Sequence, residues 1–233
     1  MPDSYDALIA SPGWQADLLA LNRCLVDSLV AAGEPPLVGG NPFYRHMQQD
    51  SILTSKYMTR NDRKRRRLFD IARLGRTLFE IGVNGGHGLL LEKSANPALL
   101  CTGIDLCQTS GFGHPRADIY CPAAMDWLSR RFPGDMRFLV GNSSDLLPAY
   151  VRDHAGAAID ILRIDGARSN YYSDFIMLRP LLHAGSLVIF DDPRWSVARA
   201  GIERAMAEGL LTPDPRFSQA ETLFDGDAVM RLT

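Results

Sequence analysis

Short apolar runs alternate with amphipathic segments from about residue 76 onward. A short apolar run bounded by polar or glycine residues is typical of a buried strand, and apolar positions every three or four residues indicate a helix. The predicted strands are Thr77–Val83, Leu99–Leu106, Met136–Val140, Ile159–Asp165 and Ser186–Asp192. The predicted helices are Gly86–Lys93, Pro122–Phe132, Ser144–His154, Tyr172–His183 and Val197–Leu210. Strands separated by helices favour an α/β, doubly wound, Rossmann-like fold with a mainly parallel sheet.

The two ends of the chain follow other patterns. Apolar residues at helical spacing predict one helix over Trp14–Ala32 and a second over Ser51–Leu74. The last residues, 216–233, are typical of two strands with a turn at Asp225–Asp227, which predicts a closing antiparallel hairpin. We therefore expect an N-terminal helical extension or lid over residues 1–75 and a core domain over residues 76–233.

Composition narrows the class of protein without identifying a function. The chain has 233 residues, of which 46% are hydrophobic and 22% charged, as in ordinary globular proteins. The net charge of −2 provides no overall attraction to nucleic acid or membrane. Its four cysteines form no CxxC pair, which favours reduced thiols. Since no signal peptide or membrane span is evident in the sequence, we expect a cytoplasmic protein.

A glycine-rich loop follows the first predicted strand. In a doubly wound sheet, ligands bind beyond the carboxyl ends of the strands, and glycines there allow the backbone to approach them. The dinucleotide fingerprint GxGxxG fails here: it would require glycine at Asn84 if it began at Gly82, or at Leu91 if it began at Gly86. A nicotinamide-dependent dehydrogenase is therefore the least favoured reading.

The segment EIGVNGGHGLLL, which begins at Glu80, resembles motif I of the class I S-adenosylmethionine (SAM)-dependent methyltransferases. The segments GIDL, LVGNSSDLLP, LRIDGARSNYYSDF and LLHAGSLVIFDD follow in that family's order and spacing. The resemblance runs from about Leu78 to the end of the chain. It implies an enzyme that binds SAM and transfers its methyl group to a small molecule.

The resemblance also implies a set of cofactor-binding residues. Glu80 would lie near the SAM amino group, and Asp105 would accept hydrogen bonds from both ribose hydroxyls, as a carboxylate with two acceptor oxygens can. Asn142 and Ser143 occupy the position beside adenine, where the family usually has Asp in place of Asn142. The glycine-rich loop contributes Gly82, Asn84 and Gly86, and the Met-Thr pair that precedes motif I in related enzymes corresponds to Met58 and Thr59.

Three acids follow neighbouring predicted strands: Asp165, Asp191 and Asp192. Adjacent strand ends lie about 4.8 Å apart, so these carboxylates can converge on one Mg²⁺ ion. The arrangement is similar to that of the metal-dependent O-methyltransferases of the catechol and macrolide-sugar types. The resemblance implies that a metal holds the substrate oxygens and lowers the pKa of the hydroxyl. Alternatively, Asp192 caps a helix that starts at Pro193, and Asp165 only orients loops.

Arg168 departs from the family pattern, which usually has a His or Lys base three residues after the strand-four acid. Arginine stays protonated and cannot take up a proton. We treat Asp165 and Arg168 as the catalytic candidates, with three readings of Arg168 left open. It could bind a carboxylate or phosphate of the substrate, it could be a solvated loop residue, or the enzyme could have lost catalysis and retained SAM binding.

The basic run Arg60–Arg67 raises the alternative of an RNA methyltransferase. The run contains Asp62 and no interleaved aromatic residues for base stacking, so a solvated helix face is favoured and a nucleic-acid partner is disfavoured. The preceding segment, Asn41–Thr59, is where such enzymes often place a substrate lid. The leading hypothesis is a SAM-dependent O-methyltransferase acting on a small-molecule hydroxyl. The acceptor and the oligomeric state are left open, and a homo-oligomer is among the options.

Overall fold

A computed structural model describes residues 2–44, 52–54, 57–109, 116–218, 223–224 and 226–233. The chain forms two compact units. Unit 1 comprises residues 1–73, 83–99 and 107–138, and unit 2 comprises residues 74–82, 100–106 and 139–233. Each unit is therefore assembled from three separate segments of the chain.

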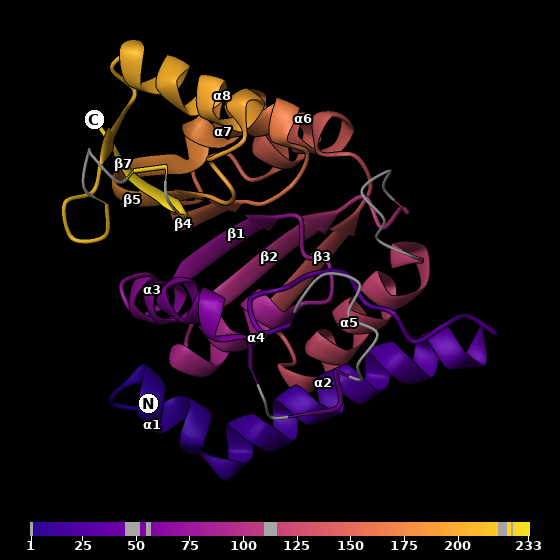
Figure 1. The fold of residues 1–233 in the computed structure, drawn as a ribbon. Coiled ribbons are helices and arrows are strands. Elements are labelled where there is room, and N and C mark those ends of the chain that lie inside the picture. Colours follow the sequence, from indigo (N-terminus) through magenta and orange to yellow (C-terminus); the bar gives the residue numbers. More distant parts are fainter. Residues whose placement is uncertain (1, 45–51, 55–56, 110–115, 219–222, 225) are drawn as a thin grey trace. The chain divides into compact units, whose positions relative to one another are not determined.

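Unit 2 contains most of a seven-stranded sheet in the order β3-β2-β1-β4-β5-β7-β6 (Figure 1). Strand β1 pairs in parallel with β2 and β4, and β4 pairs in parallel with β5. Strand β7 pairs antiparallel with β5 and β6. The strands are β1 (Thr77–Ile81), β2 (Leu100–Asp105), β3 (Met136–Val140), β4 (Ile159–Ile164), β5 (Leu182–Phe190), β6 (Leu211–Pro213) and β7 (Ala228–Leu232). The predicted α/β fold with a mainly parallel sheet is confirmed.

Helices α6 (Ser143–Asp153), α7 (Tyr171–Leu178) and α8 (Ser196–Ala207) pack on one face of these strands (Figure 1). Alternate residues of each strand point to this face because successive side chains of a strand alternate in direction. The resulting core includes Phe79 and Ile81 of β1, Leu162 and Ile164 of β4, Val188 and Phe190 of β5, Leu147 of α6, Phe175 of α7 and Ile202 of α8. Burial of this apolar surface is the main source of stability of unit 2.

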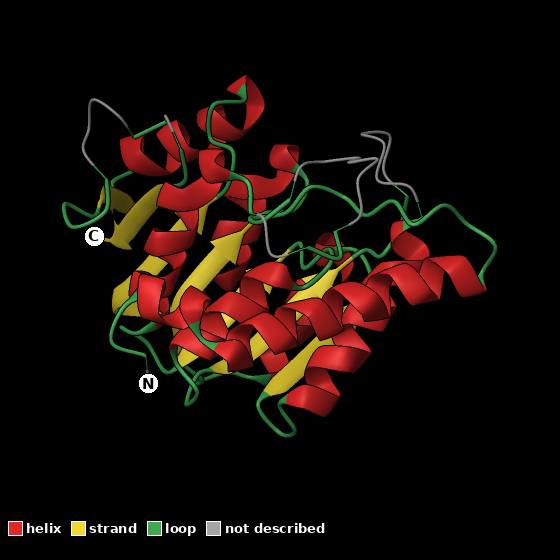
Figure 2. Cartoon of the chain, turned by 60° about the horizontal axis from the view of Figure 1, so that its bottom comes forward, coloured by secondary structure: helices red, strands yellow, loops and turns green. Residues whose placement is uncertain are grey.

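Among the described residues, the regular elements of unit 1 are helices, apart from the first residues of β3. Its helices are α1 (Tyr5–Ala10), α2 (Pro12–Ala31), α3 (Asp62–Ala72), α4 (His87–Ala95) and α5 (Ala117–Arg131). Figure 2 colours the helices red and the strands yellow. Helix α2 begins where Ser11 accepts a hydrogen bond from the Trp14 backbone N–H and Pro12 takes the first helical position, a common helix start. Leu18, Leu21 and Leu25 form its buried face.

The structure corrects three sequence-based boundaries. The second predicted helix begins at Asp62, after a 3-10 turn at Thr59–Asn61, because the Met58 backbone N–H donates to the Phe43 carbonyl, and not to the carbonyl four residues earlier. Helix α7 ends at Leu178, close to Pro180, and β5 then begins at Leu182.

The third correction concerns the closing hairpin. The antiparallel pair is present, but its first strand is β6, upstream of residue 216. Residues 214–218 form a turn in which the Asp214 carbonyl accepts hydrogen bonds from the N–H groups of Phe217 and Ser218. Residues 216–218 therefore belong to a turn and not to the predicted strand. Asp225 of the predicted turn lies outside the described residues. Within the described part of the chain, no helix is both long and apolar enough to span a membrane.

Candidate functional site

The candidate site lies at the carboxyl edge of the sheet, where the strand order reverses. Strands β1 and β4 are neighbours there, and the chain winds outward from them in opposite directions. Such switch points are where doubly wound sheets bind ligands. Backbone hydrogen bonds extend the ladder to the first loop residues: Gly82 N–H to Ile104 O (2.8 Å), Gly141 N–H to Asp105 O (2.9 Å), Asp165 N–H to Ile81 O (2.8 Å) and Asp191 N–H to Ile164 O (3.0 Å). The loop bases in unit 2 are thus fixed to the sheet.

Gly82 is held against the backbone that follows β4. Its φ is +93°, and a Cβ at this position would lie 2.4 Å from the Asp165 carbonyl oxygen. Real Cβ atoms do not approach backbone atoms so closely. Glycine is therefore required at Gly82 both for its backbone conformation and for the space it leaves.

Glu80 forms a buried ion pair with Arg163, which the sequence reasoning missed. The two residues are register partners on β1 and β4, so their side chains leave the same face of the sheet. Both are almost completely buried, and an Arg163 guanidinium nitrogen donates to a Glu80 carboxylate oxygen. An arginine within the apolar strand Ile159–Ile164 was the available signal, because a buried charge requires a partner. Glu80 is thus engaged within the sheet itself.

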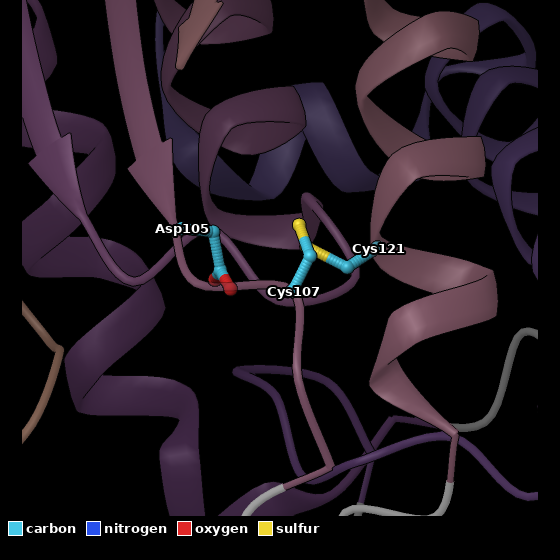
Figure 3. Close-up of side chains that lie close together, drawn as sticks. All are labelled: Asp105, Cys107 and Cys121. Atoms are coloured by element: carbon cyan, nitrogen blue, oxygen red, sulfur yellow. The ribbon is translucent and has the colours of Figure 1, made fainter. Parts of the chain in front are cut away.

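Asp105 is the last residue of β2, and its side chain is half-buried. Its neighbour Cys107 has a φ of +50° and is buried. The Cys107 sulfur lies 3.1 Å from that of Cys121 on α5, and Figure 3 shows the two sulfur atoms facing each other. No disulfide joins them.

Asn142 and Ser143 form the start of helix α6. The Asn142 side-chain oxygen accepts a hydrogen bond from the Ser144 backbone N–H (3.0 Å), which assigns the amide orientation and leaves the NH₂ group pointing outward as a donor. The Ser143 hydroxyl donates to an Asp174 carboxylate oxygen at 2.9 Å. Both predicted adenine-side residues are therefore ordered by helix α6 and its neighbour α7.

Asp174 provides a pH-dependent contribution to stability. Burial raises its pKa from 3.8 to about 6, although the Ser143 hydrogen bond lowers it in part. Between these two values the folded protein holds a proton that the unfolded chain releases, so the stability falls as the pH rises through this window, by about 1.4 kcal/mol per unit. We expect Asp174→Asn to gain stability relative to wild type from pH 4 to 6 and to keep the gain above pH 6.

The measurement is urea unfolding of both proteins from pH 4 to 8. Asp145→Asn, an exposed carboxylate in the first turn of the same helix as Ser143, is the matched control and should change the stability by no more than about 0.5 kcal/mol. Equal stability of Asp174→Asn and wild type at pH 8 would contradict the assignment.

The three predicted metal ligands differ in their exposure to solvent. Asp165 is exposed, Asp191 is 9% exposed and Asp192 is half-buried. Tyr171 donates its hydroxyl to the Asp191 backbone carbonyl at 2.7 Å, which anchors this strand end; burial, together with the charges of Asp165 and Asp191, raises the pKa of Tyr171. Among the described residues, these acids do not form a group whose ligand atoms all lie within 4.8 Å of one another.

Arg168 makes an ion pair with Asp192. Its Nη2 atom lies 2.7 Å from Oδ2 of Asp192, and its guanidinium lies 4.9 Å from the centre of the Trp195 ring. The alternative role of Asp192 as a helix cap is wrong: α8 starts at Ser196 and the residue at its cap position is Trp195. The reason is a turn in which the Trp195 N–H donates to the Asp192 carbonyl, so Pro193 precedes the helix.

The remaining predicted cofactor residues belong to unit 1. The Asn84 amide donates to the Gly40 carbonyl (3.0 Å) and accepts from the Tyr120 hydroxyl (2.7 Å). Both ends of the Asn84 amide are thus used to fix the glycine-rich loop. Gly86, with a φ of +73°, occupies the cap position of α4. Met58 is half-buried and Thr59 is exposed.

The basic run is partly buried, contrary to the expected solvated helix face. Arg65 is 3% exposed. It donates to the Tyr5 hydroxyl at 2.6 Å and to the carbonyls of Pro42 and Met58 at 2.8 Å each. Arg66 pairs with Asp6 and Asp62. These two arginines are consequently structural groups of unit 1, which weakens the argument for RNA binding.

We expect Arg65→Ala to destabilise the protein by about 3 kcal/mol, because it leaves a buried hydroxyl and two carbonyls without their donor. Arg63→Ala removes the same charge from an exposed position of the same helix and should change the stability by no more than about 0.5 kcal/mol. Thermal unfolding of both variants measures the difference. Similar melting temperatures for the two would contradict the structural role of Arg65.

Comparisons with known proteins agree with this geometry. Residues 79–193 match the model of a family described as a methyltransferase domain. A search of curated protein sequences found no match. Among solved structures, an O-methyltransferase from Bacillus cereus in complex with SAH is 16% identical and has a TM-score of 0.58, over 98% of this chain and 94% of the other.

Two further structures are similar over most of the chain. The O-methyltransferase TomG from Streptomyces achromogenes, in complex with SAM, is 17% identical and has a TM-score of 0.54. The match covers 92% of this chain and 89% of TomG. CalS11, described as a TDP-rhamnose 3'-O-methyltransferase of calicheamicin biosynthesis, is 16% identical, covers 95% of each chain and has a TM-score of 0.55.

Together, the strand order, the switch point and the matched family define a methyltransferase of the Rossmann-like class. Residues 79–193 resemble a methyltransferase domain. The prediction of a methyltransferase is confirmed by the family match, and the solved O-methyltransferases show the same fold.

Proposed function

We propose that this enzyme transfers the methyl group of SAM to a hydroxyl of a small molecule. The observation that carries the proposal is the order of side chains along the carboxyl edge of the sheet. Asp105 and Glu80 lie in the last residues of β2 and β1, and Asn142 and Asp165 follow the neighbouring strands β3 and β4. This order suits adenine, ribose, the amino-acid tail and the acceptor in turn. The names of the similar structures, all O-methyltransferases, support a hydroxyl acceptor.

Each residue supports the proposal through its chemistry. The Asp105 carboxylate can accept from both hydroxyls of the ribose. The Asn142 oxygen caps α6, so its NH₂ group donates to an acceptor nitrogen of adenine. Gly82 brings the backbone close to the cofactor because it has no side chain. Glu80 shares its charge between Arg163 and the amino group of the cofactor.

Bound SAM would supply a methyl group already activated by its sulfonium, and the bond from sulfur to methyl would break as the bond to the acceptor oxygen formed. The work left to the protein is to hold the acceptor oxygen in line, about 3–3.5 Å from the methyl carbon. Asp165 is exposed at the end of β4 and is the candidate group to receive the hydroxyl proton. The hydroxyl proton becomes acidic as the bond between oxygen and methyl forms, so a carboxylate can accept it in the transition state.

Magnesium assistance through Asp165, Asp191 and Asp192 stays a prediction, and the residues fit it poorly. Mg²⁺ requires several oxygen ligands at close, near-octahedral positions. Asp192 instead has Arg168 within hydrogen-bond distance and a second arginine, Arg194, at 3.5 Å. No step of the proposed reaction therefore depends on a metal.

Calorimetric titration of SAM tests the proposal. We expect binding to wild type, and binding weakened about a hundredfold in Asp105→Ala, because two charge-assisted hydrogen bonds are lost. Asp153→Ala, which removes an exposed carboxylate at the end of α6, should bind like wild type. A panel of phenols and nucleotide-linked sugars then tests for conversion of SAM to S-adenosylhomocysteine. Absence of SAM binding in wild type would refute the proposal, and binding without turnover would favour a non-catalytic SAM-binding protein.

A further inference from the structure

The environment of Asp192 is unusual for a metal-ligating carboxylate. Its Oδ2 atom lies 2.7 Å from Nη2 of Arg168, and its Oδ1 atom lies 3.5 Å from Nη2 of Arg194. Both oxygens therefore face a guanidinium group. A carboxylate oxygen that accepts a hydrogen bond from arginine has less electron density to offer a hard cation.

Arg168 is held in this position from two sides. Asp192 binds one edge of the guanidinium, and the Trp195 ring lies against its face at 4.9 Å. The Trp195 side chain is 47% exposed, so the stacking keeps a large aromatic ring at the surface beside the cation. Cation–π contact and a charge-assisted hydrogen bond together restrict a side chain that would otherwise be flexible.

The charge of Arg168 also disfavours a metal ion at Asp192. Arginine is protonated at every accessible pH, so Arg168 carries a permanent positive charge next to Asp192. A divalent cation bound to this carboxylate would have to displace Arg168 and then remain close to it. It would also need Asp165 and Asp191 to contribute oxygens, although these acids and Asp192 are not gathered within 4.8 Å of one another among the described residues.

We propose that Arg168 is the resident cation of this acidic strand edge and takes the place of a divalent metal at Asp192. Arg168 stands where the resemblance leads one to expect a His or Lys base, and in this chain it is a counter-ion of Asp192. The inference concerns which ion neutralises Asp192 and needs no turnover for its test. Only its consequence for activity, that turnover is insensitive to a chelator, rests on the proposed function.

The test is binding of Mn²⁺ to the purified protein, followed by electron paramagnetic resonance of the free ion. We expect wild type to leave millimolar Mn²⁺ free, and Arg168→Gln to bind it, because the substitution releases the Asp192 carboxylate. Arg168→Lys keeps the positive charge and should behave like wild type. Adding Asp192→Asn to Arg168→Gln should abolish the new binding.

Arg152→Gln is the matched control, because it releases Asp153 from an exposed arginine–aspartate pair with a distance of 3.0 Å. It should bind no Mn²⁺, since Asp153 lies at the end of α6, whereas Asp192 shares the strand edge with Asp165 and Asp191. Circular dichroism and melting temperature verify that each variant is folded. Mn²⁺ binding to wild type that is lost in Asp192→Asn would overturn the proposal. Failure of both wild type and a folded Arg168→Gln variant to bind Mn²⁺ would equally overturn it, because Arg168 would then not be what excludes the metal.

Discussion

Replacing Gly82 with alanine is expected to destabilise the protein by about 4 kcal/mol and to abolish SAM binding. The new Cβ would lie 2.4 Å from the carbonyl oxygen and 2.6 Å from the carbonyl carbon of Asp165, and the φ of +93° is unfavourable for any residue with a Cβ. Relieving the overlap requires β1 and the loop after β4 to separate, which costs packing and strand-end hydrogen bonds. Urea unfolding and calorimetry with SAM measure the two effects.

The variant Gly156→Ala measures the cost of a positive φ without the steric clash that alanine would cause at Gly82. Gly156 has a φ of +88° and lies in the same unit, but a Cβ there would meet no atom within 4 Å. We expect a loss of about 1 kcal/mol and normal SAM binding. If the two alanine variants lost similar stability, the close approach of Gly82 to Asp165 would not be what requires glycine.

Replacing Glu80 with glutamine is expected to cost about 3–5 kcal/mol. The substitution removes the carboxylate charge that Glu80 provides to Arg163, which is 3% exposed. The control is Glu203→Gln, which breaks an exposed pair with Arg199 on α8 and should cost less than about 0.5 kcal/mol. Chemical unfolding compares the two, and a small effect at Glu80 would contradict the buried ion pair.

A double variant distinguishes the structural role of Glu80 from its proposed cofactor role. Glu80→Met with Arg163→Met removes both charges together, and buried pairs replaced in this way often recover their stability. We expect the double variant to be more stable than Glu80→Gln and still unable to bind SAM tightly. Wild-type affinity for SAM in a stable double variant would remove Glu80 from the cofactor site.

Local patterns were sufficient to predict the first five strands of the sheet. The strand Met136–Val140 was predicted at its observed bounds, and Thr77–Val83 differs from β1 only at its end. Such runs are fixed by burial of short apolar segments, which the sequence displays directly. The closing hairpin was misplaced because β6 is only three residues long and contains Pro213. A strand of three residues is too short to show an alternating hydrophobic pattern in the sequence. It is defined by its pairing with β7.

The candidate site was predictable only in part, because its partners are distant in sequence. Motif spacing placed Asp105 and Asn142 at neighbouring strand ends, as the strand order requires. It could not show that Arg163 neutralises Glu80, since that pairing depends on the β1–β4 register. The burial of Arg65 was hidden in the same way, because Tyr5 lies 60 residues earlier. The ligand roles themselves stay predictions.

The interleaving of the two units has a consequence for how the protein is made. The chain passes between the units five times, and unit 1 receives its last segment only at residues 107–138. During synthesis, the leucine face of α2 must therefore wait for α5 before it is buried, and the sheet is complete only when β7 has left the ribosome. No single cut releases either unit as a continuous fragment. A truncation at residue 75 would leave both pieces with exposed apolar surface, which favours aggregation.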